Sequence, residues 1–220
     1  RKSRACGERG TSRCSWHGQG KPQNELCESG YSRTPVHRLR ISCLRVRFDG
    51  VAVGMCLNGF STIMSHQRMD FFLLAMDQLV NSASKWNFMF GNKNKINMTI
   101  RLIVGRGWGQ GPTHSQNLQS WFAHIPNLKV VSPSFPSTAS ALLSQSIRDP
   151  FPTLFIENRW CHQLKEDVGS HYKNKKKIKI GKANLLNSGK DLTIITISYS
   201  TIELFKCYDF LKKKKLILII

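Results

Sequence analysis

Acidic residues are scarce in this sequence. Asp and Glu number 13 against 33 Lys and Arg, which gives a formal net charge of +20 over 220 residues. Such an imbalance is typical of proteins that meet nucleic acid or an anionic surface. Here, however, much of the excess lies in an Arg-rich stretch (1–47) and in lysine runs at 173–179 and 212–215. The lysine runs have no interleaved aromatic residues and no nucleic-acid-binding signature, which favours solvated tails. We therefore do not expect a nucleic-acid partner, although a basic nucleic-acid-binding protein stays the alternative from another functional class.

Close cysteine pairs and long apolar runs are also missing. No two cysteines have C-x-x-C spacing, which argues against a zinc site and favours free thiols in a reducing compartment. No run of about 18 apolar residues occurs, so no membrane-spanning segment is expected. The N-terminus has no apolar core like that of a signal peptide, and its Arg- and Ser-rich composition weakly resembles an organellar transit peptide. The seven cysteines are Cys6, Cys14, Cys27, Cys43, Cys56, Cys161 and Cys207.

The apolar pattern divides the chain into four parts. Residues 1–49 show no sustained period and are predicted to be a poorly ordered basic segment. Residues 50–165 alternate between strand and helix patterns, which predicts an α/β domain with a parallel sheet. Residues 166–190 read as a Lys-rich linker, and 191–220 as the truncated start of a second α/β domain. The expected strands are 61–64, 98–104, 128–131, 153–157 and 192–198, and the expected helices are 51–60, 68–90, 115–125, 137–148 and 201–211.

One of these helices presents a clear apolar stripe and a pair of adjacent phenylalanines. The stripe spacing of four, three, four and three residues predicts a buried helix face. Only one of Phe71 and Phe72 can lie on that face, and the stripe assigns Phe72 to it. Phe71 is then available to offer its ring to a flat heterocycle, although plain core packing is the simpler interpretation. The stripe consists of Phe72, Met76, Leu79, Ala83 and Trp86.

The loop that follows the expected strand 98–104 is rich in glycine and reads GRGWGQGPTHSQ (105–116). Ligands of open parallel sheets bind outside the carboxyl ends of strands, where bare backbone can approach them closely. The spacing is not the dinucleotide fingerprint, so taken alone it favours a structural turn. His114 is expected just before a helix N-terminus, which would favour a neutral imidazole suited to acid–base work. A bracing or capping histidine is the alternative.

Three segments together resemble the beta subunit of the decarboxylating component of 2-oxo acid dehydrogenase complexes, with pyruvate dehydrogenase as the nearest sense of the match. They are MDFFLLAMDQLVNSASKW (69–86), GRGWGQGPTHSQNLQSWFAHIPNLKVVSPSFP (105–136) and SIRDPFPTLFIENRW (146–160). The resemblance covers Gly50 to about Lys165 and continues weakly through 189–200. It implies a three-layer, transketolase-like pyrimidine-binding domain. It also implies oxidative decarboxylation of a 2-oxo acid, with acyl transfer to lipoamide.

The resemblance assigns roles to particular residues. It implies that Phe71 stacks near the aminopyrimidine ring of thiamine diphosphate, with Gln67 close by in place of an apolar residue. His114 matches the histidine that contacts the reacting intermediate. A structural potassium ion is expected near Ser146, Ile147 and Asp149.

The resemblance also implies partners and a location. The G-D-G motif that binds magnesium and the diphosphate is absent, as expected if an alpha subunit supplies that half of the site. A lipoyl acyltransferase core is the second expected partner. The location would be the cytoplasm in a bacterium, or alternatively the mitochondrial matrix.

Two departures from the family pattern predict impaired catalysis. Without gaps, Arg45 stands where the family has the glutamate that bonds the pyrimidine ring, and Asp49 is the nearest carboxylate. Ser65 and His66 stand where a second glutamate is expected. Loss of a positioned acid–base group costs about 10²–10⁴ in rate. A non-catalytic remnant or a gene-model fragment of the same subunit is therefore the main alternative to a working enzyme.

Overall fold

The structure is a computed structural model in which residues 48–167, 178–213 and 218–219 are described. All of them belong to one compact unit, 48–220, which is separate from residues 1–47. The expectation of a poorly ordered N-terminal segment, and the assignment of Arg45, therefore lie outside the described residues. Most of the lysine run at 173–179 does so as well.

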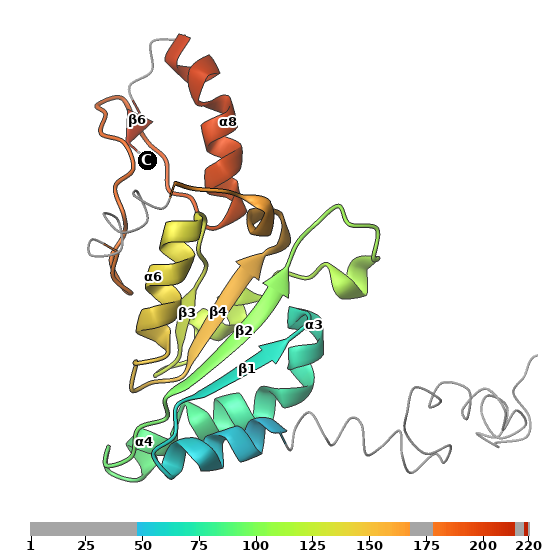
Figure 1. Cartoon of the computed structure of the whole chain (residues 1–220), viewed down its shortest axis with the longest axis vertical. Helices are drawn as coiled ribbons and strands as arrows, with labels where there is room; N and C mark the ends of the chain where they lie inside the picture. The colour runs from blue at the N-terminus through green and yellow to red at the C-terminus, as the bar shows by residue number, and fades with distance from the viewer. Residues whose placement is uncertain (1–47, 168–177, 214–217, 220) are drawn as a thin grey trace, which may run out of the picture. The chain divides into compact units, whose positions relative to one another are not determined.

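A four-stranded parallel sheet is the centre of the unit (Figure 1). The strands lie in the order β1 (Thr62–His66), β2 (Met98–Val104), β4 (Thr153–Asn158) and β3 (Lys129–Val131). Every neighbouring pair is parallel, with Thr62 opposite Met98 and Thr99 opposite Thr153. The predicted parallel α/β sheet is confirmed, and its four strands overlap four of the five expected ones.

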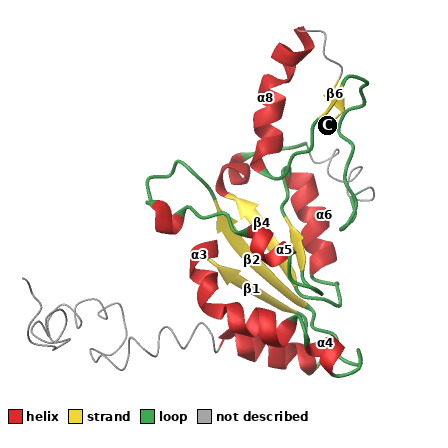
Figure 2. Cartoon of the chain, turned by 180° about the vertical axis from the view of Figure 1, so that it is seen from behind, coloured by secondary structure: helices red, strands yellow, loops and turns green. Residues whose placement is uncertain are grey.

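Burial alternates along β2, the most apolar strand. Ile100, Leu102 and Val104 are buried, whereas Arg101 and Ile103 are only partly buried on the other face. Side chains of successive strand residues point to opposite faces, so β2 offers one fully covered face and one that is more open. The covered face packs against helices that come from before β1 and from between β1 and β2 (Figure 2).

The first described helix spans residues 48–57 and packs on that face through Ala52, Val53 and Cys56. Gly59 ends it with a positive φ of 90°. The amide of Phe60 donates to the carbonyl of Met55 at 3.1 Å, which is the six-to-one bond of a glycine-capped helix end. The expected glycine stop is therefore confirmed.

The expected helix 68–90 is present as a helical stretch of mixed geometry rather than as one α-helix. It contains α3 (Met69–Phe72), the 3-10 turn η2 (Leu73–Ala75), the π-helical η3 (Gln78–Ala83) and α4 (Trp86–Met89). The amide of Ser84 donates to the carbonyl of Leu79 at 2.9 Å, five residues back, as a π-helix requires. Phe72, Leu79 and Ala83 are buried and Met76 and Trp86 pack against them, which confirms the predicted stripe.

The opposite face of the sheet carries α6 (Pro136–Ser146), which contacts β4 (Figure 1). Phe155 of β4 is 1% exposed and lies between two residues of the main core, so alternation places it under α6. A further helix, α5 (Gln119–Ala123), packs beside β3 and contributes Phe122 to the main core. Helices thus lie on both faces of the sheet, as the expected three-layer α/β architecture requires.

The C-terminal part corrects one prediction. The expected buried strand 192–198 is wrong, because only β5 (Leu192–Thr193) is a strand and it pairs solely with β6 (Leu218–Ile219). Ile195 and Ile197 are 88% and 58% exposed. An apolar run becomes a buried strand only where a sheet receives it, and no larger sheet does so in the described residues. The expected helix that follows is confirmed as α8 (Tyr199–Lys213).

No helix in the described ranges has both the length and the apolar character needed to cross a membrane.

Candidate functional site

The glycine-rich loop leaves the carboxyl end of β2 and returns through the 3-10 turn η4 (Pro112–His114) (Figure 1). A Cβ on Gly105 would lie 3.4 Å from the Cβ of Arg159 and from the ring of Trp108, which is close packing. Gly111 precedes η4 with a φ of 71°, a conformation that L side chains rarely adopt. The loop therefore depends on glycine for its last turn.

The structure brings His114 and Phe71 together at this edge of the sheet. Their ring centroids are 5.2 Å apart with an angle of 50° between the planes. Phe71 is partly buried, whereas Phe72 beside it is fully buried in the core. The expected division between one core phenylalanine and one outward-facing phenylalanine is thus what the structure shows.

His114 has one ring nitrogen without a partner. Its Nδ1 is buried and no described group bonds it. Its backbone carbonyl accepts a hydrogen bond from Nη1 of Arg68 at 3.4 Å, which ties the loop to the segment before α3. A buried nitrogen without a partner is costly unless a ligand or water completes it. The imidazole is therefore held in place and has hydrogen-bonding capacity left for a bound molecule.

One expectation about His114 is wrong. It does not stand at the N-terminus of the next helix, because α5 begins at Gln119, five residues later. His114 instead ends the three-residue turn η4. A 3-10 turn is too short to carry the dipole that was expected to favour the neutral imidazole.

Gln67 follows the last residue of β1 and lies four residues before Phe71. Its side chain is exposed. Its role beside the cofactor stays a prediction.

The residues expected to hold potassium lie at the opposite, amino end of β4. Ser146 is fully buried and its hydroxyl donates to the carbonyl of Leu142 at 2.8 Å. The carboxylate of Asp149 accepts hydrogen bonds from Nζ of Lys129 at 2.5 Å and from the amide of Phe151 at 3.0 Å. The ammonium of Lys129 therefore already neutralises this carboxylate. A potassium ion bound by Asp149 would compete with Lys129, and the site stays a prediction.

A buried carboxylate–imidazole pair was not foreseen from the sequence. Asp49, 1% exposed, lies with Oδ1 3.3 Å from Nε2 of His66, and its Oδ2 has no partner among the described residues. The ring of His66 also meets the edge of Phe72 at 5.0 Å between centroids. Asp49 is the carboxylate nearest to the position of the family's glutamate, and His66 stands where a second glutamate is expected. The structure places these two side chains in contact with each other.

Two guanidinium groups gather around Trp108 and were also missed. Cζ of Arg68 is 4.6 Å and Cζ of Arg159 is 5.5 Å from the centroid of the indole ring. The indole Nε1 donates to Oγ of Ser115 at 2.8 Å, which fixes the ring across the loop. The sequence signal that could have indicated this cluster was a tryptophan inside a glycine-rich loop, because so large a ring packs against neighbouring side chains. We call Arg68, Trp108 and Arg159 the arginine–tryptophan cluster.

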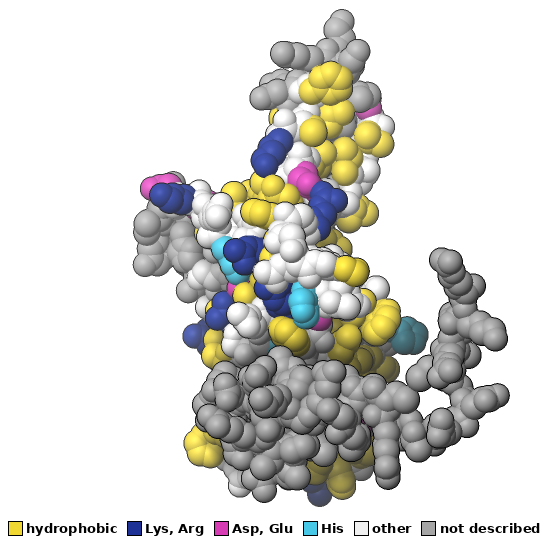
Figure 3. All heavy atoms as spheres, turned by 90° about the vertical axis from the view of Figure 1, so that its right-hand side faces the viewer, with side chains coloured by type: hydrophobic (Ala, Val, Ile, Leu, Met, Phe, Trp, Pro, Cys, Tyr) yellow, Lys and Arg dark blue, Asp and Glu magenta, His cyan; other side chains and the backbone are white. Residues whose placement is uncertain are grey.

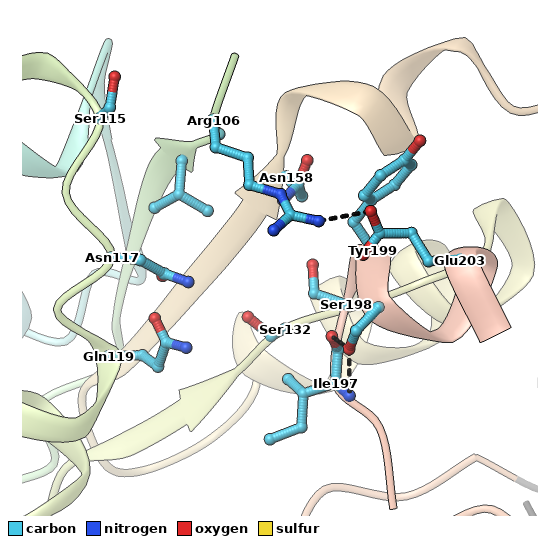
Figure 4. A pocket seen from close by; sticks show the side chains of 13 residues that line it. Arg106, Ser115, Asn117, Gln119, Ser132, Asn158, Ile197, Ser198, Tyr199 and Glu203 are labelled. Carbon is cyan, nitrogen blue, oxygen red and sulfur yellow. Dashed lines mark hydrogen bonds and ion pairs between the residues drawn. The ribbon is translucent and has the colours of Figure 1, made fainter. Parts of the chain in front are cut away.

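A cavity of about 420 Å³ opens at the carboxyl ends of β2, β3 and β4 (Figure 4). Most of the side chains that line it carry an amide or a hydroxyl group, and Nη2 of Arg106 donates to Oε1 of Glu203 of α8 at 2.5 Å. Its lining includes Gly105 and Ser115, the residue after His114, but neither His114 nor Phe71. Figure 3 shows Lys, Arg and His side chains gathered in the middle of the face from which the glycine-rich loop protrudes.

A second cavity, of about 270 Å³, lies between α6 and β4. Glu157 holds Arg101 through two hydrogen bonds of 2.7 and 2.9 Å and also contacts Nε2 of His162 at 3.0 Å. The hydrogen bond with Glu157 raises the pKa of Arg101. Burial raises the pKa of the neighbouring Cys161 thiol, although a hydrogen bond with Ser198 opposes that rise. The thiol is thus not activated as a nucleophile.

Comparisons with known proteins agree with this geometry. The family model for the transketolase pyrimidine binding domain matches residues 47–161. The beta subunit of acetoin:2,6-dichlorophenolindophenol oxidoreductase from Cupriavidus necator is 38% identical over 151 residues, which are 68% of this chain and 43% of that protein. The mitochondrial beta subunits of the pyruvate dehydrogenase E1 component are 35% identical in Chaetomium thermophilum and 32% in Saccharomyces cerevisiae. Each match covers 76% of this chain, and 44% and 46% of the two relatives. The chain thus spans less than half the length of these relatives.

Solved structures show the same fold at low identity. A split-gene transketolase described as an inactive beta4 tetramer superposes with a TM-score of 0.59 at 17% identity, over 80% of this chain and 53% of that one. A transketolase variant from Pichia stipitis gives a TM-score of 0.62 at 16% identity, over 80% of this chain and 25% of the other. The matched family model covers more than half of the 220 residues and contains the whole sheet with both Phe71 and His114. This chain belongs to the transketolase pyrimidine-binding domain family.

Proposed function

We propose that this chain provides the pyrimidine-binding half of a thiamine-diphosphate site in a 2-oxo acid dehydrogenase, in the manner of a beta subunit. The observation that carries the proposal is the contact between Phe71 and His114, 5.2 Å between centroids, at the carboxyl end of a parallel sheet. Ligands of such sheets bind at this edge. The names of the similar beta subunits support the same reading.

The described residues fit the cofactor's flat heterocycle. Phe71 supplies a partly buried aromatic face, and aromatic rings pair favourably in offset or tilted arrangements. The unpartnered Nδ1 of His114 supplies a hydrogen-bonding position beside that face. When bound, the cofactor supplies the carbanion that attacks the oxo carbon of the substrate. The protein's task is orientation, exclusion of water and placement of protons.

In this reading His114 contacts the substrate and holds a proton next to its oxygen. Arg68 fixes the backbone at His114 by donating to its carbonyl, and the ring of Phe71 contacts the imidazole, so less ordering is needed when substrate arrives. Gln67 is proposed to lie near the ring on the side of β1. An alpha subunit would supply the magnesium and diphosphate half, and a lipoyl acyltransferase core would accept the acyl group.

We further propose that catalysis by this chain is impaired. Without gaps, the family's glutamate would correspond to Arg45, and a cation there would oppose protonation of the pyrimidine ring. The nearest described carboxylate, Asp49, has one oxygen on His66. Loss of a positioned acid–base group lowers a rate by about 10²–10⁴. Turnover by the assembled alpha and beta subunits should therefore be very low.

Reconstitution with a cognate alpha subunit tests this proposal. Thiamine diphosphate binding is measured by calorimetry, and turnover by reduction of an artificial electron acceptor with pyruvate and, separately, with 2-oxoglutarate as substrate. We expect cofactor binding with very low turnover, and a rise of about 10²-fold or more when Arg45→Glu is introduced. Arg47→Glu makes the same charge change two residues away and is the matched control. Near-normal turnover of the unaltered chain would refute the impairment, and absence of cofactor binding would refute the assignment itself.

The proposed location follows the relatives. Their names include mitochondrial proteins of fungi and a protein of the bacterium Cupriavidus necator. We accordingly propose the cytoplasm if the chain is bacterial and the mitochondrial matrix as the alternative.

A potassium ion near Ser146, Ile147 and Asp149 stays part of the proposal. The thermal midpoint of the chain should then rise in potassium chloride relative to sodium chloride at equal ionic strength. Lys129→Met should enlarge the difference, because it frees the Asp149 carboxylate. Identical midpoints in the two salts for both proteins would remove the ion from the proposal.

A further inference from the structure

The arginine–tryptophan cluster joins three segments that are distant in sequence. Arg68 comes from the turn between β1 and α3, Trp108 from the glycine-rich loop, and Arg159 from the 3-10 turn η5 (Arg159–Gln163) after β4. The indole ring of Trp108 and the Cβ of Arg159 flank Gly105, each 3.4 Å from the position that a Cβ on this glycine would take. The ring is also bonded through Nε1 to Ser115. The cluster is therefore a fixed part of the fold rather than a chance meeting of surface side chains.

Neither guanidinium group forms an ion pair with a carboxylate of the described residues. In the ranges that the structure describes, no Asp or Glu oxygen lies within ion-pair distance of Arg68 or Arg159. Two other arginines nearby are neutralised, Arg101 by Glu157 and Arg106 by Glu203. Stacking on an aromatic ring engages the face of a guanidinium and leaves the N–H groups at its edge free. These edges suit a planar anion such as a carboxylate.

The cluster adjoins the position proposed for the reacting substrate. One N–H group of Arg68 donates a hydrogen bond to the backbone carbonyl of His114. Ser115, which holds the indole, lines the cavity of about 420 Å³ that also begins at Gly105. Arg68, Trp108 and Arg159 are not among the residues that line this cavity. A molecule beside the imidazole of His114 would instead meet their charge through Arg68, which contacts the backbone of the same residue.

We propose that the cluster binds a second negative group on the substrate, so that the preferred 2-oxo acid is a dicarboxylic one. This inference rests on the proposed function and specifies its substrate class. The carboxylate next to the oxo group leaves as carbon dioxide, and tight binding of that group would stabilise the ground state and slow its loss. A distal carboxylate is unchanged in the reaction. Charge-assisted hydrogen bonds to it therefore contribute to binding without that penalty.

Binding to the full-length chain tests the inference without requiring turnover. Trp108 reports on the cluster through its indole N–H signal in ¹⁵N spectra, identified as the signal lost in Trp108→Phe. The probes are 2-oxoglutarate, the monocarboxylic 2-oxobutyrate and inorganic sulfate. We expect 2-oxoglutarate to bind at least tenfold more tightly than either of the others. Arg159→Gln and Arg68→Gln should each weaken its binding by about tenfold or more, and Arg159→Gln should leave binding of 2-oxobutyrate nearly unchanged.

The control variant is Arg148→Gln, which removes the same charge from an exposed position at the amino end of β4. Arg159 is also exposed and donates no hydrogen bond that holds the loop, so Arg159→Gln separates ligand binding from folding. Equal affinity for the two oxo acids, sulfate binding as tight as that of 2-oxoglutarate, or an equal effect of Arg148→Gln would each overturn the inference. Cofactor binding to the assembled subunits is measured separately. A chain that binds thiamine diphosphate but shows no dicarboxylate preference therefore refutes this inference alone.

Discussion

Replacement of Phe72 by alanine should cost far more stability than the same replacement at Phe71. Phe72 is 0% exposed and meets His66 at 5.0 Å and Phe122 at 5.7 Å between ring centroids. Truncation of a fully buried phenylalanine costs about 3–5 kcal/mol, because transfer energy is lost and a cavity remains. For a chain of this size each kcal/mol lowers the midpoint by about 2–4 °C. A fall of roughly 6–20 °C is therefore expected for Phe72→Ala.

Phe71 lies on the other side of the same helical turn. It is only partly buried, and its ring meets the imidazole of His114. A ring pair of this kind contributes about 0.5–1.5 kcal/mol beyond its buried area. Phe71→Ala should therefore lower stability by roughly 1–2 kcal/mol. Its main effect should be to weaken thiamine diphosphate binding by the assembled subunits about tenfold.

The two substitutions delete the same atoms from adjacent positions, so each is the control for the other. Urea unfolding followed by far-ultraviolet circular dichroism gives the free energies of unfolding. Calorimetry on the assembled subunits gives the cofactor affinities. Equal destabilisation by the two variants would show that both rings are core residues. The site described around His114 would then lose its aromatic face.

Three further outcomes follow from the ion pairs, the thiols and the loop. Glu157→Gln should lower the free energy of unfolding by about 1–2 kcal/mol, discounted for the 41% exposure of Arg101; an unchanged urea midpoint would contradict this. Cys161 should react with iodoacetamide at pH 8 more slowly than the exposed Cys207, as read by peptide mass spectrometry, because burial raises the pKa of the Cys161 thiol. Because the pKa of the Cys161 thiol is raised in the folded chain, the contribution of this thiol to the free energy of unfolding is fully present below the unfolded pKa of about 8.5. That contribution is lost as the pH rises through the folded pKa. Gly111→Ala should destabilise the chain by about 1 kcal/mol in thermal unfolding, whereas Gly54→Ala, which meets open space in a helix, should not.

The sheet was predictable because each strand can be recognised from the apolar pattern of its own residues. Residues 98–104 and 153–157 are short apolar runs, and helical patterns separate the strands, so the parallel order follows from connection rules. The adjacency of Phe71 and His114 was accessible only through the family resemblance. Nothing in the local sequence says that a loop residue will meet a helix residue 43 positions earlier. The bond from Arg68 to the carbonyl of His114 was equally inaccessible.

The errors have specific causes. The stripe at 68–90 predicts which side chains are buried but not the hydrogen-bond period, and Phe72 and Leu79 are buried whether the backbone is α-helical or π-helical. The run at 192–198 has the composition of a buried strand, yet burial depends on neighbouring strands that composition cannot supply. His114 was placed at a helix N-terminus because a helix was expected over residues 115–125, whereas α5 begins only at Gln119.

The strand order has a practical consequence for handling this chain. β1 lies at one border of the sheet, and in the described part of the molecule no strand pairs with its outer side. It is five residues long, whereas β3 at the opposite border has only three. Ile63 is 51% exposed on it, and no lysine or proline interrupts it. An open, uncharged border of this kind is a template for strand addition, so self-association at high concentration should begin at β1 rather than at β3.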